Sequence, residues 1–369
     1  MFAFSDNWGR TVMMLASIRL TSLRLLLLSG LMGGALAACA PEQKLTPLPP
    51  APIPVAAVAP PPVALSSQVV ERAGQFRTYM RHAASITPSF TSGPAIEDSL
   101  TLGESYEAQQ LSRGAIAYAA VVALQEPGFV ASVRTYAVDP VQRKALAQKL
   151  ASDPYYATAL PGAPAAAGLI IASLNAEGAK VRGAGELVKQ SAYDVQHQAW
   201  SKTPITDPAG RLAHAKVVSA APMTTETADL NQMKRAVTGS DDRAVERKVA
   251  VAGAASAPPY TQVVTRGLAV AAIAALGEGG DENDAALEPL LDDTKDGFCL
   301  NMSKLNLYQC LAVAKPWYED IFCLGQHVLI DTGQCIAKAA GQPQPVQTPA
   351  PSTAAQSLAP AARADAAGR

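Results

Sequence analysis

Cysteines are the residues of this chain with the clearest chemistry. Cys299, Cys310, Cys323 and Cys335 lie within 37 consecutive residues, and Cys39 lies far from them. An even number of closely grouped cysteines in an exported chain predicts two disulfide bonds. Zinc is the weaker alternative, because the spacing lacks the close cysteine pairs of zinc sites and His327 alone could add a nitrogen. A redox pair is also weaker, because the body has no Cys-x-x-Cys motif.

The spacing of these four cysteines ranks the three ways of pairing them. Cys299 and Cys310 on one helix would lie about 16 Å apart, whereas a disulfide needs Cα atoms within about 7 Å. A turn near residues 315–316 would leave Cys310 and Cys323 at similar distances from it, with Cys299 and Cys335 farther out. The sequence therefore predicts nested bonds in a helical hairpin, Cys310 to Cys323 and Cys299 to Cys335.

The second arm of this hairpin is longer than the first. We expect Asp331, Thr332 and Gly333 to absorb the extra residues by breaking the second helix. The layout is similar to the twin Cys-x9-Cys hairpins of mitochondrial intermembrane-space proteins, but here ten and eleven residues separate the cysteines. The similarity indicates convergent geometry.

Other motifs of catalysis or metal binding are missing from the sequence. The four histidines, His82, His197, His214 and His327, lie in separate segments without His-x-x-x-His spacing. The mature body has no serine-hydrolase motif, phosphate loop or dinucleotide fingerprint. The acidic run that begins at Asp281 lacks the glycine of a calcium loop and is more typical of a helix N-terminus. We therefore predict no catalytic residue, no metal site and no cofactor.

The N-terminus carries the pattern of an export signal. Arg19 and Arg24 precede an apolar run and several small residues, which predicts a signal peptide over residues 1–38. It ends in Leu36-Ala37-Ala38-Cys39, which resembles the lipobox of bacterial lipoprotein precursors. The resemblance implies that Cys39 carries a lipid and becomes the mature N-terminus, and that Ala40 directs sorting to the outer membrane. A plain secretion signal is the alternative, and a spanning helix is the weaker one.

Composition divides the mature chain into five parts. Residues 39–65 include nine prolines and predict an extended tether, and residues 341–369 predict a disordered tail. Between them we expect a helical bundle over 66–238, a flexible linker over 239–258 and a helical subdomain with the four-cysteine hairpin over 259–340.

Apolar residues in the body recur mostly at helical spacing, which predicts an all-α fold, an irregular helical bundle. The longest predicted helix, Pro164 to Lys202, has a heptad pattern with one branched stripe and one stripe of small residues such as Gly178 and Gly185. We expect a second helix, Gly103 to Gln125, to pair with it in antiparallel orientation. A break near Gly183 is the competing interpretation of the long segment.

Charge and aromatic residues bear on function. The chain has 30 basic and 31 acidic residues, which argues against nucleic-acid binding. Trp317 and Tyr318 lie beside the hairpin turn and are candidate contact residues for an envelope protein partner.

We expect a lipid-anchored, non-catalytic envelope protein that acts as a structural or adaptor element on the periplasmic side of the outer membrane. The alternatives are a bundle that binds an apolar or cell-wall-derived ligand and an envelope enzyme with an unrecognised site, which carboxylates converging in a cleft would favour.

Overall fold

The computed structural model describes residues 59–239 and 255–341. The predicted signal peptide, Cys39, most of the tether, most of the linker and the tail beyond Gly341 lie outside the described residues. The described chain is all-α and contains no strand, in agreement with the predicted fold class. Its α-helices are α1 Ser67–Ser85, α2 Gly93–Glu104, α3 Ala108–Ala123, α4 Pro127–Arg134, α5 Pro140–Ser152, α6 Ala163–Val195, α7 Pro208–Ala220, α8 Thr227–Thr238, α10 Gln262–Leu276, α11 Asp284–Leu287, α12 Thr294–Val313, α13 Trp317–Cys323 and α14 Asp331–Ala339.

Shorter helical pieces connect some of these helices. Four are 3₁₀ helices and one is a π-helix: η1 Pro154–Ala159, η2 Trp200–Lys202, η3 Asp281–Asn283, η4 Glu288–Leu291 and the π-helical η5 Leu324–Ile330. Within the described residues no single helix is long and apolar enough to span a membrane. Helices α3 and α4 together have the required length and apolarity, but the chain bends by 84° between them.

Helices α1, α3 and α10 pack together into an apolar core. Small residues allow the close approach: a side chain on Gly267 of α10 would meet Ala119 of α3, and one on Gly114 of α3 would meet Phe76 of α1. Helix α10 is buried on nearly all sides although it follows the linker in the sequence. The segments before and after residues 240–254 therefore share one core.

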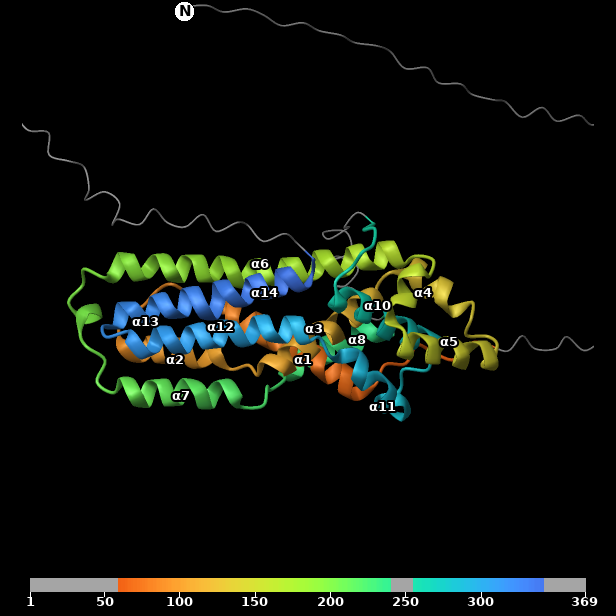
Figure 1. Cartoon of the computed structure of the whole chain (residues 1–369), viewed down its shortest axis with the longest axis horizontal. Coiled ribbons are helices and arrows are strands. Elements are labelled where there is room, and N and C mark those ends of the chain that lie inside the picture. The colour runs from red at the N-terminus through yellow and green to blue at the C-terminus, as the bar shows by residue number, and fades with distance from the viewer. Residues whose placement is uncertain (1–58, 240–254, 342–369) are drawn as a thin grey trace, which may run out of the picture. The chain divides into compact units, whose positions relative to one another are not determined.

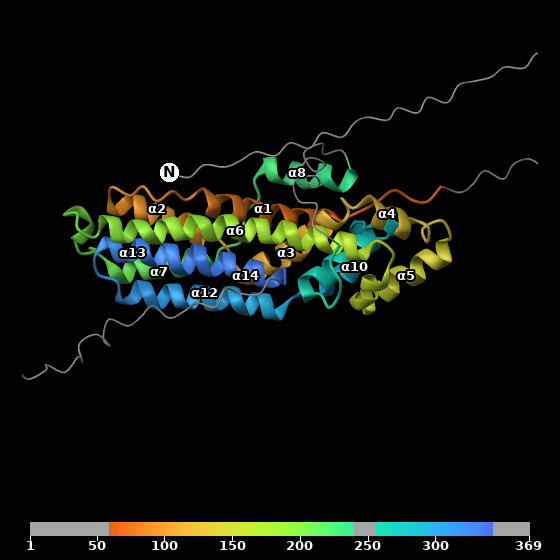
Figure 2. The same ribbon diagram turned by 90° about the horizontal axis from the view of Figure 1, so that it is seen from above.

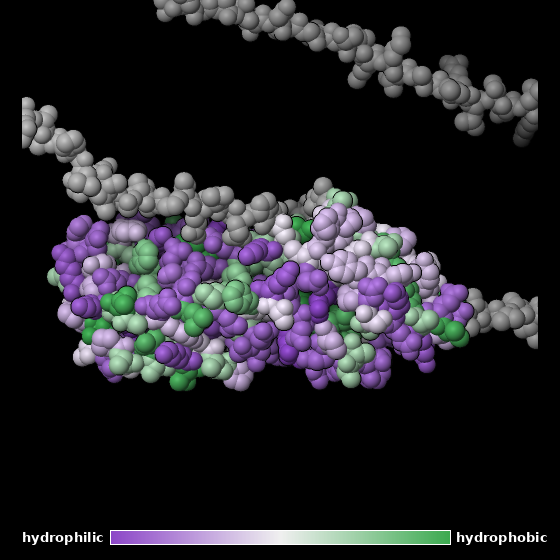
Figure 3. Space-filling model, viewed as in Figure 1, coloured by the Kyte–Doolittle hydropathy of each residue, from purple (hydrophilic) through white to green (hydrophobic). Residues whose placement is uncertain are grey.

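The long heptad-patterned helix is present as α6, but it is shorter than predicted. It ends at Val195 because the chain turns there, and the Ser201 hydroxyl donates a hydrogen bond to the Val195 carbonyl. It continues unbroken through Gly183. In both ribbon views α6 runs beside α13 and α14 (Figures 1 and 2). On the face of the molecule seen in Figure 3, hydrophobic residues are scattered among hydrophilic ones.

The partner of the small-residue stripe differs from the prediction. Gly178 lies against Gly333, and Gly185 lies against Gly325, so the stripe packs on the η5 and α14 segments. Helix α3 also contacts α6, but it packs mainly on α1 and α10. The predicted helix Gly103–Gln125 is in fact divided between α2 and α3, because the Glu107 side chain accepts hydrogen bonds from two backbone N–H groups and begins a new helix.

The nested disulfides are confirmed. Cys299 bonds to Cys335 and Cys310 bonds to Cys323, which links α12 to the α13–α14 arm. The predicted break at residues 331–333 is wrong, because α14 begins at Asp331 and continues through Gly333. The π-helical η5 absorbs the extra residue instead. Eleven residues of α-helix bring a side chain back to within about 20° of its starting direction, but twelve leave it about 120° away, and a π turn accommodates the one additional residue.

Candidate functional site: a cleft beside Trp317

Trp317 and Tyr318 begin α13 but lie in different surroundings. Trp317 packs on α2, where its ring lies within 3 Å of the position that a side chain on Gly93 would occupy. Tyr318 lies with Tyr193 and Phe322 in a separate groove of about 380 Å³. The structure thus does not join the two predicted contact residues into one surface.

Trp317 forms one wall of a cleft between α2, α7 and α13, which we call the Trp317 cleft. Its volume is about 430 Å³, the size of a small-molecule site. The lining residues are Glu97, Asp98, Leu100, Thr101, Glu104, Thr206, Asp207, Gly210, Arg211, His214, Ala215 and Trp317. Four of them are carboxylic acids, so the lining of this cleft is rich in acidic side chains.

Glu104 is the buried acid of the cleft. Glu104 is only 2% exposed, and its Oε1 atom has no hydrogen-bond partner in the described chain. Burial raises the pKa of the Glu104 carboxyl to about 8, although the nearby Lys304 opposes that shift. The carboxyl is therefore mostly protonated at neutral pH, which limits the cost of burying it.

Lys304 lies behind Glu104 on α12. Its Nζ donates to the backbone carbonyls of Glu104 (3.4 Å) and Ser219 (3.2 Å) and lies 3.8 Å from the centre of the Tyr106 ring. Burial lowers the pKa of Lys304 to about 7, while Glu104 acts in the opposite direction. Glu104 and Lys304 thus form a coupled buried pair in which burial favours the neutral form of each partner.

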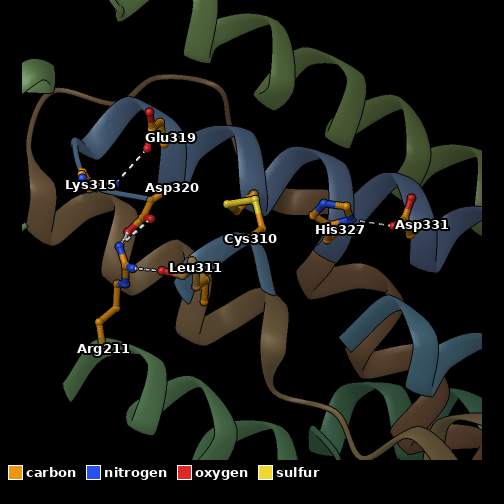
Figure 4. The surroundings of a disulfide bond; sticks show 9 residues. Arg211, Cys310, Leu311, Lys315, Glu319, Asp320, His327 and Asp331 are labelled. Carbon is orange, nitrogen blue, oxygen red and sulfur yellow. Dashed lines mark hydrogen bonds and ion pairs between the residues drawn. A yellow bond between two sulfur atoms is a disulfide. The ribbon is translucent and has the colours of Figure 1, made fainter. Parts of the chain in front are cut away.

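A buried ion pair supports the other side of the cleft. Arg211 of α7 donates through Nη1 to both carboxylate oxygens of Asp320, at 2.6 and 2.5 Å, and through Nη2 to the carbonyl of Leu311 (Figure 4). The side chains of Arg211 and Asp320 are 6% and 0% exposed. Burial raises the pKa of Asp320 to about 6, and Arg211 opposes the shift. The charge of Arg211 is therefore largely compensated inside the protein.

The rim of the cleft is acidic. Glu97 and Asp98 are exposed on α2, and neither forms a hydrogen bond or an ion pair with another residue in the described part of the chain. Asp207 accepts a hydrogen bond from the Gly210 N–H (2.9 Å) and caps α7. His214 lies 3.2 Å from the Thr101 hydroxyl. With Arg211 compensated, the cleft has an excess of negative charge.

This arrangement suits a positively charged ligand. An organic cation would find an aromatic ring for a cation–π contact and carboxylates at the rim. The cleft is less suited to a metal ion than to an organic cation, because no group of three or more potential metal-ligand side chains occurs among the described residues.

The buried groups of this site are not among the residues predicted from the sequence. One signal was available: Lys304 lies on the same helical stripe as Leu300, Leu307 and Leu311, all of which are buried. A lysine on an apolar stripe predicts a buried charge with a specific partner. Glu104, Arg211 and Asp320 carry no comparable signal, because only the packing of α2, α7 and α13 brings them together.

The comparisons give no relative from which a function could be transferred. No known protein family, curated protein or solved structure matches this chain.

Proposed function

We propose that this protein is a lipid-anchored, non-catalytic envelope protein whose helical body binds a small organic cation in the Trp317 cleft. The observation that carries the proposal is an acid-lined cleft of about 430 Å³ that has an aromatic wall and a buried carboxyl with a partnerless oxygen. The lipid anchor rests on the resemblance of residues 36–39 to a lipobox, and it places the cleft at a membrane surface.

Each part of the cleft has a role in this proposal. The exposed carboxylates of Glu97 and Asp98 attract the cation and face little competition from other protein groups. The Trp317 ring contributes a cation–π contact of about 0.5 to 2 kcal/mol, depending on how far water is excluded. The partnerless Glu104 oxygen accepts a hydrogen bond from an ammonium group of the ligand.

Intrinsic fluorescence tests this proposal directly. The chain from residue 39 onward contains two tryptophans, Trp200 and Trp317, so Trp200→Phe leaves Trp317 as the reporter. We expect putrescine and tetramethylammonium to change the Trp317 emission in a saturable way, and succinate to leave it unchanged. Asp98→Asn should weaken the response. Equal responses to cations and to succinate, or no response to either cation, would contradict cation binding.

A second measurement separates two sources of such a ligand. Amine-bearing cell-wall fragments and free polyamines share the ammonium chemistry. Native mass spectrometry of protein purified from its own envelope should show an added mass that disappears in Glu104→Gln, and that mass distinguishes a peptide fragment from a polyamine.

The anchor has its own test. Cys39→Ser should release the protein from the membrane fraction, because several acyl chains make attachment effectively permanent. Intact-mass analysis of the unaltered protein should show the added lipid. Complete retention of Cys39→Ser in membranes would contradict lipid anchoring without affecting cation binding.

The Tyr318 groove favours a second candidate function, that of an adaptor. Tyr193 and Val313 in this groove are exposed, 48% and 74% respectively, and they line it together with the Cys310–Cys323 disulfide. Exposed aromatic and aliphatic residues in one groove are typical of protein contact sites. Photocrosslinking from position 318 should then capture one envelope protein, and Val313→Glu should abolish the crosslink. Equal capture from position 217, an exposed valine of α7, would argue against a specific partner.

A further inference from the structure

The two disulfides of the hairpin have different surroundings. Cys310–Cys323 borders the aromatic groove of Tyr318. Cys299–Cys335 borders a separate cavity of about 290 Å³, which also contains Asp296 and which we call the Asp296 cavity. Thus a buried titratable group lines the cavity beside the Cys299–Cys335 disulfide.

Asp296 lies one helical turn before Cys299 in α12. The residue is 5% exposed, and neither of its carboxyl oxygens has a hydrogen-bond partner among the described residues. The Ser112 hydroxyl of α3 acts on it only weakly, since it donates to the Asp293 carbonyl (3.3 Å). A buried carboxylate without partners is costly, so the neutral acid is the favoured form. Burial raises the pKa of Asp296 to about 7, and the nearby charge of Asp293 makes a smaller contribution in the same direction.

We propose that the Cys299–Cys335 disulfide exchanges with an external dithiol, and that the carboxylic acid of Asp296 protonates the departing sulfur. The proposal is independent of cation binding in the Trp317 cleft. Cys299 is the accessible partner because it is half-buried, whereas Cys335 is 3% exposed.

The exchange proceeds in two balanced steps. A thiolate of the dithiol attacks Sγ of Cys299, the Cys299–Cys335 bond breaks, and Sγ of Cys335 leaves with the electron pair and takes the proton of Asp296. The second thiolate of the dithiol then attacks the dithiol's first sulfur, the bond between that sulfur and Cys299 breaks, and Cys299 leaves as a thiolate that is protonated from water. The protein gains two electrons and two protons, and the dithiol is oxidised to a cyclic disulfide. Asp296 recovers its proton from water.

The other groups that face the cavity are consistent with this role. Lys295 of α12 and Lys338 of α14 are positively charged side chains that favour the approach of a thiolate. Asp293, which caps α12, is the acidic neighbour, and the other polar lining residues are Tyr155, Tyr260, Thr261 and Gln262.

Beside the Cys310–Cys323 bond, which borders the Tyr318 groove, Asp320 lies one helical turn before Cys323 in α13, but both of its carboxylate oxygens accept hydrogen bonds from Arg211. Glu319 borders the same groove, but its carboxylate accepts a hydrogen bond from the Lys315 N–H (2.8 Å), as Figure 4 shows. This second bond therefore serves as an internal reference in the same molecule.

The experiment compares the opening rates of the two bonds. The chain from residue 39 with Cys39→Ser is treated with dithiothreitol, quenched by alkylation and mapped by mass spectrometry. At pH 7 we expect Cys299–Cys335 to open at least ten times faster than Cys310–Cys323. Asp296→Asn should slow the first bond about tenfold and leave the second unchanged, whereas Glu319→Gln should change neither.

The pH profile of the rate ratio separates proton donation from a change in stability. The ratio cancels the thiolate concentration of the reagent. It should therefore fall as the pH rises from 6 to 8 in the unaltered protein, because Asp296 loses its proton around pH 7, and it should be flat in Asp296→Asn. Leu268→Ala, which weakens the core at a residue that lines neither the Asp296 cavity nor the Tyr318 groove, should preserve the ratio. Equal opening rates, or a ratio that Asp296→Asn does not alter, would overturn the proposal.

Discussion

The interior around α10 and the interior between α2, α7, α12 and α13 are built from different residues. Every buried residue of α10 is apolar or glycine except Thr265. The second interior buries Glu104, Lys304, Arg211 and Asp320. Both lie in one folded unit, so the contrast is not explained by a lack of apolar residues in the chain.

The difference separates what stabilises the fold from what supports a site. Apolar burial contributes about 25 cal/mol per Å² without requiring directional partners. Buried charges contribute little net stability, because desolvation offsets their attraction, and they lose several kcal/mol when one partner is removed. The buried ionisable residues beside the cleft are therefore consistent with the proposed ligand binding, and the contrast between the two interiors makes quantitative predictions.

Breaking the buried ion pair should have the largest effect. Asp320→Ala leaves the Arg211 guanidinium buried without its carboxylate, and we expect a loss of about 3 to 5 kcal/mol in urea unfolding. The double variant Arg211→Met/Asp320→Leu should be close to the unaltered protein in stability, because both charges are removed together. A double variant as unstable as Asp320→Ala would indicate that the pair itself stabilises the fold.

Shortening a side chain in the apolar interior should cost slightly less. Leu268 is fully buried on α10, and Leu268→Ala should lose about 2 to 4 kcal/mol through lost burial and the cavity left behind. The loss should be the same at pH 5 and pH 8, since no titratable group is involved. Leu305→Ala, at an exposed position of α12, is the matched control and should change stability little.

The pH dependence of stability should separate the two interiors further. The pKa of Glu104 is raised from 4.5 to about 8, so the folded state holds a proton that the unfolded state releases between these values. The contribution of this group is complete below pH 4.5 and is lost as the pH rises toward 8. Glu104→Gln has no such proton, so the melting temperature of the unaltered protein should fall relative to Glu104→Gln between pH 4.5 and pH 7.

Exposed Glu282→Gln is the control for that experiment. Restricting the comparison to pH 7 and below avoids the range in which Lys304 titrates differently in the folded and unfolded states. Parallel curves for the unaltered protein and Glu104→Gln would show that Glu104 is not buried as described.

Glycines of α6, which contacts both interiors, should give the smallest effects. A side chain at Gly183 meets no atom within 4 Å, so Gly183→Ala should stabilise the protein by about 0.5 to 1 kcal/mol through helix propensity. At Gly185 a new Cβ would lie 2.8 Å from the Gly325 carbonyl, so Gly185→Ala should destabilise by about 1 to 3 kcal/mol. Thermal melts of equal sign for the two variants would contradict the packing of α6 on η5.

The sequence predicted the apolar interior and the disulfide hairpin better than the polar site. Helical periodicity and cysteine spacing are local signals, and they led to the all-α fold, the long helix and both disulfide pairs. The π-helical η5 was missed because a local insertion leaves no residue-type signature, although the extra residue between Cys323 and Cys335 required some adjustment. Glu104 and Asp320 were missed because their burial depends on helices distant in the sequence.

Isothermal titration calorimetry with putrescine is the most direct test of cation binding in the Trp317 cleft. The unaltered mature protein should bind with one site per chain, and binding should weaken at least tenfold in the double variant Glu97→Gln/Asp98→Asn, which alters only exposed carboxylates. Binding should weaken with rising salt as well. Undetectable binding, or equal binding by the unaltered protein and the double variant, would contradict the assignment of this cleft as a cation site.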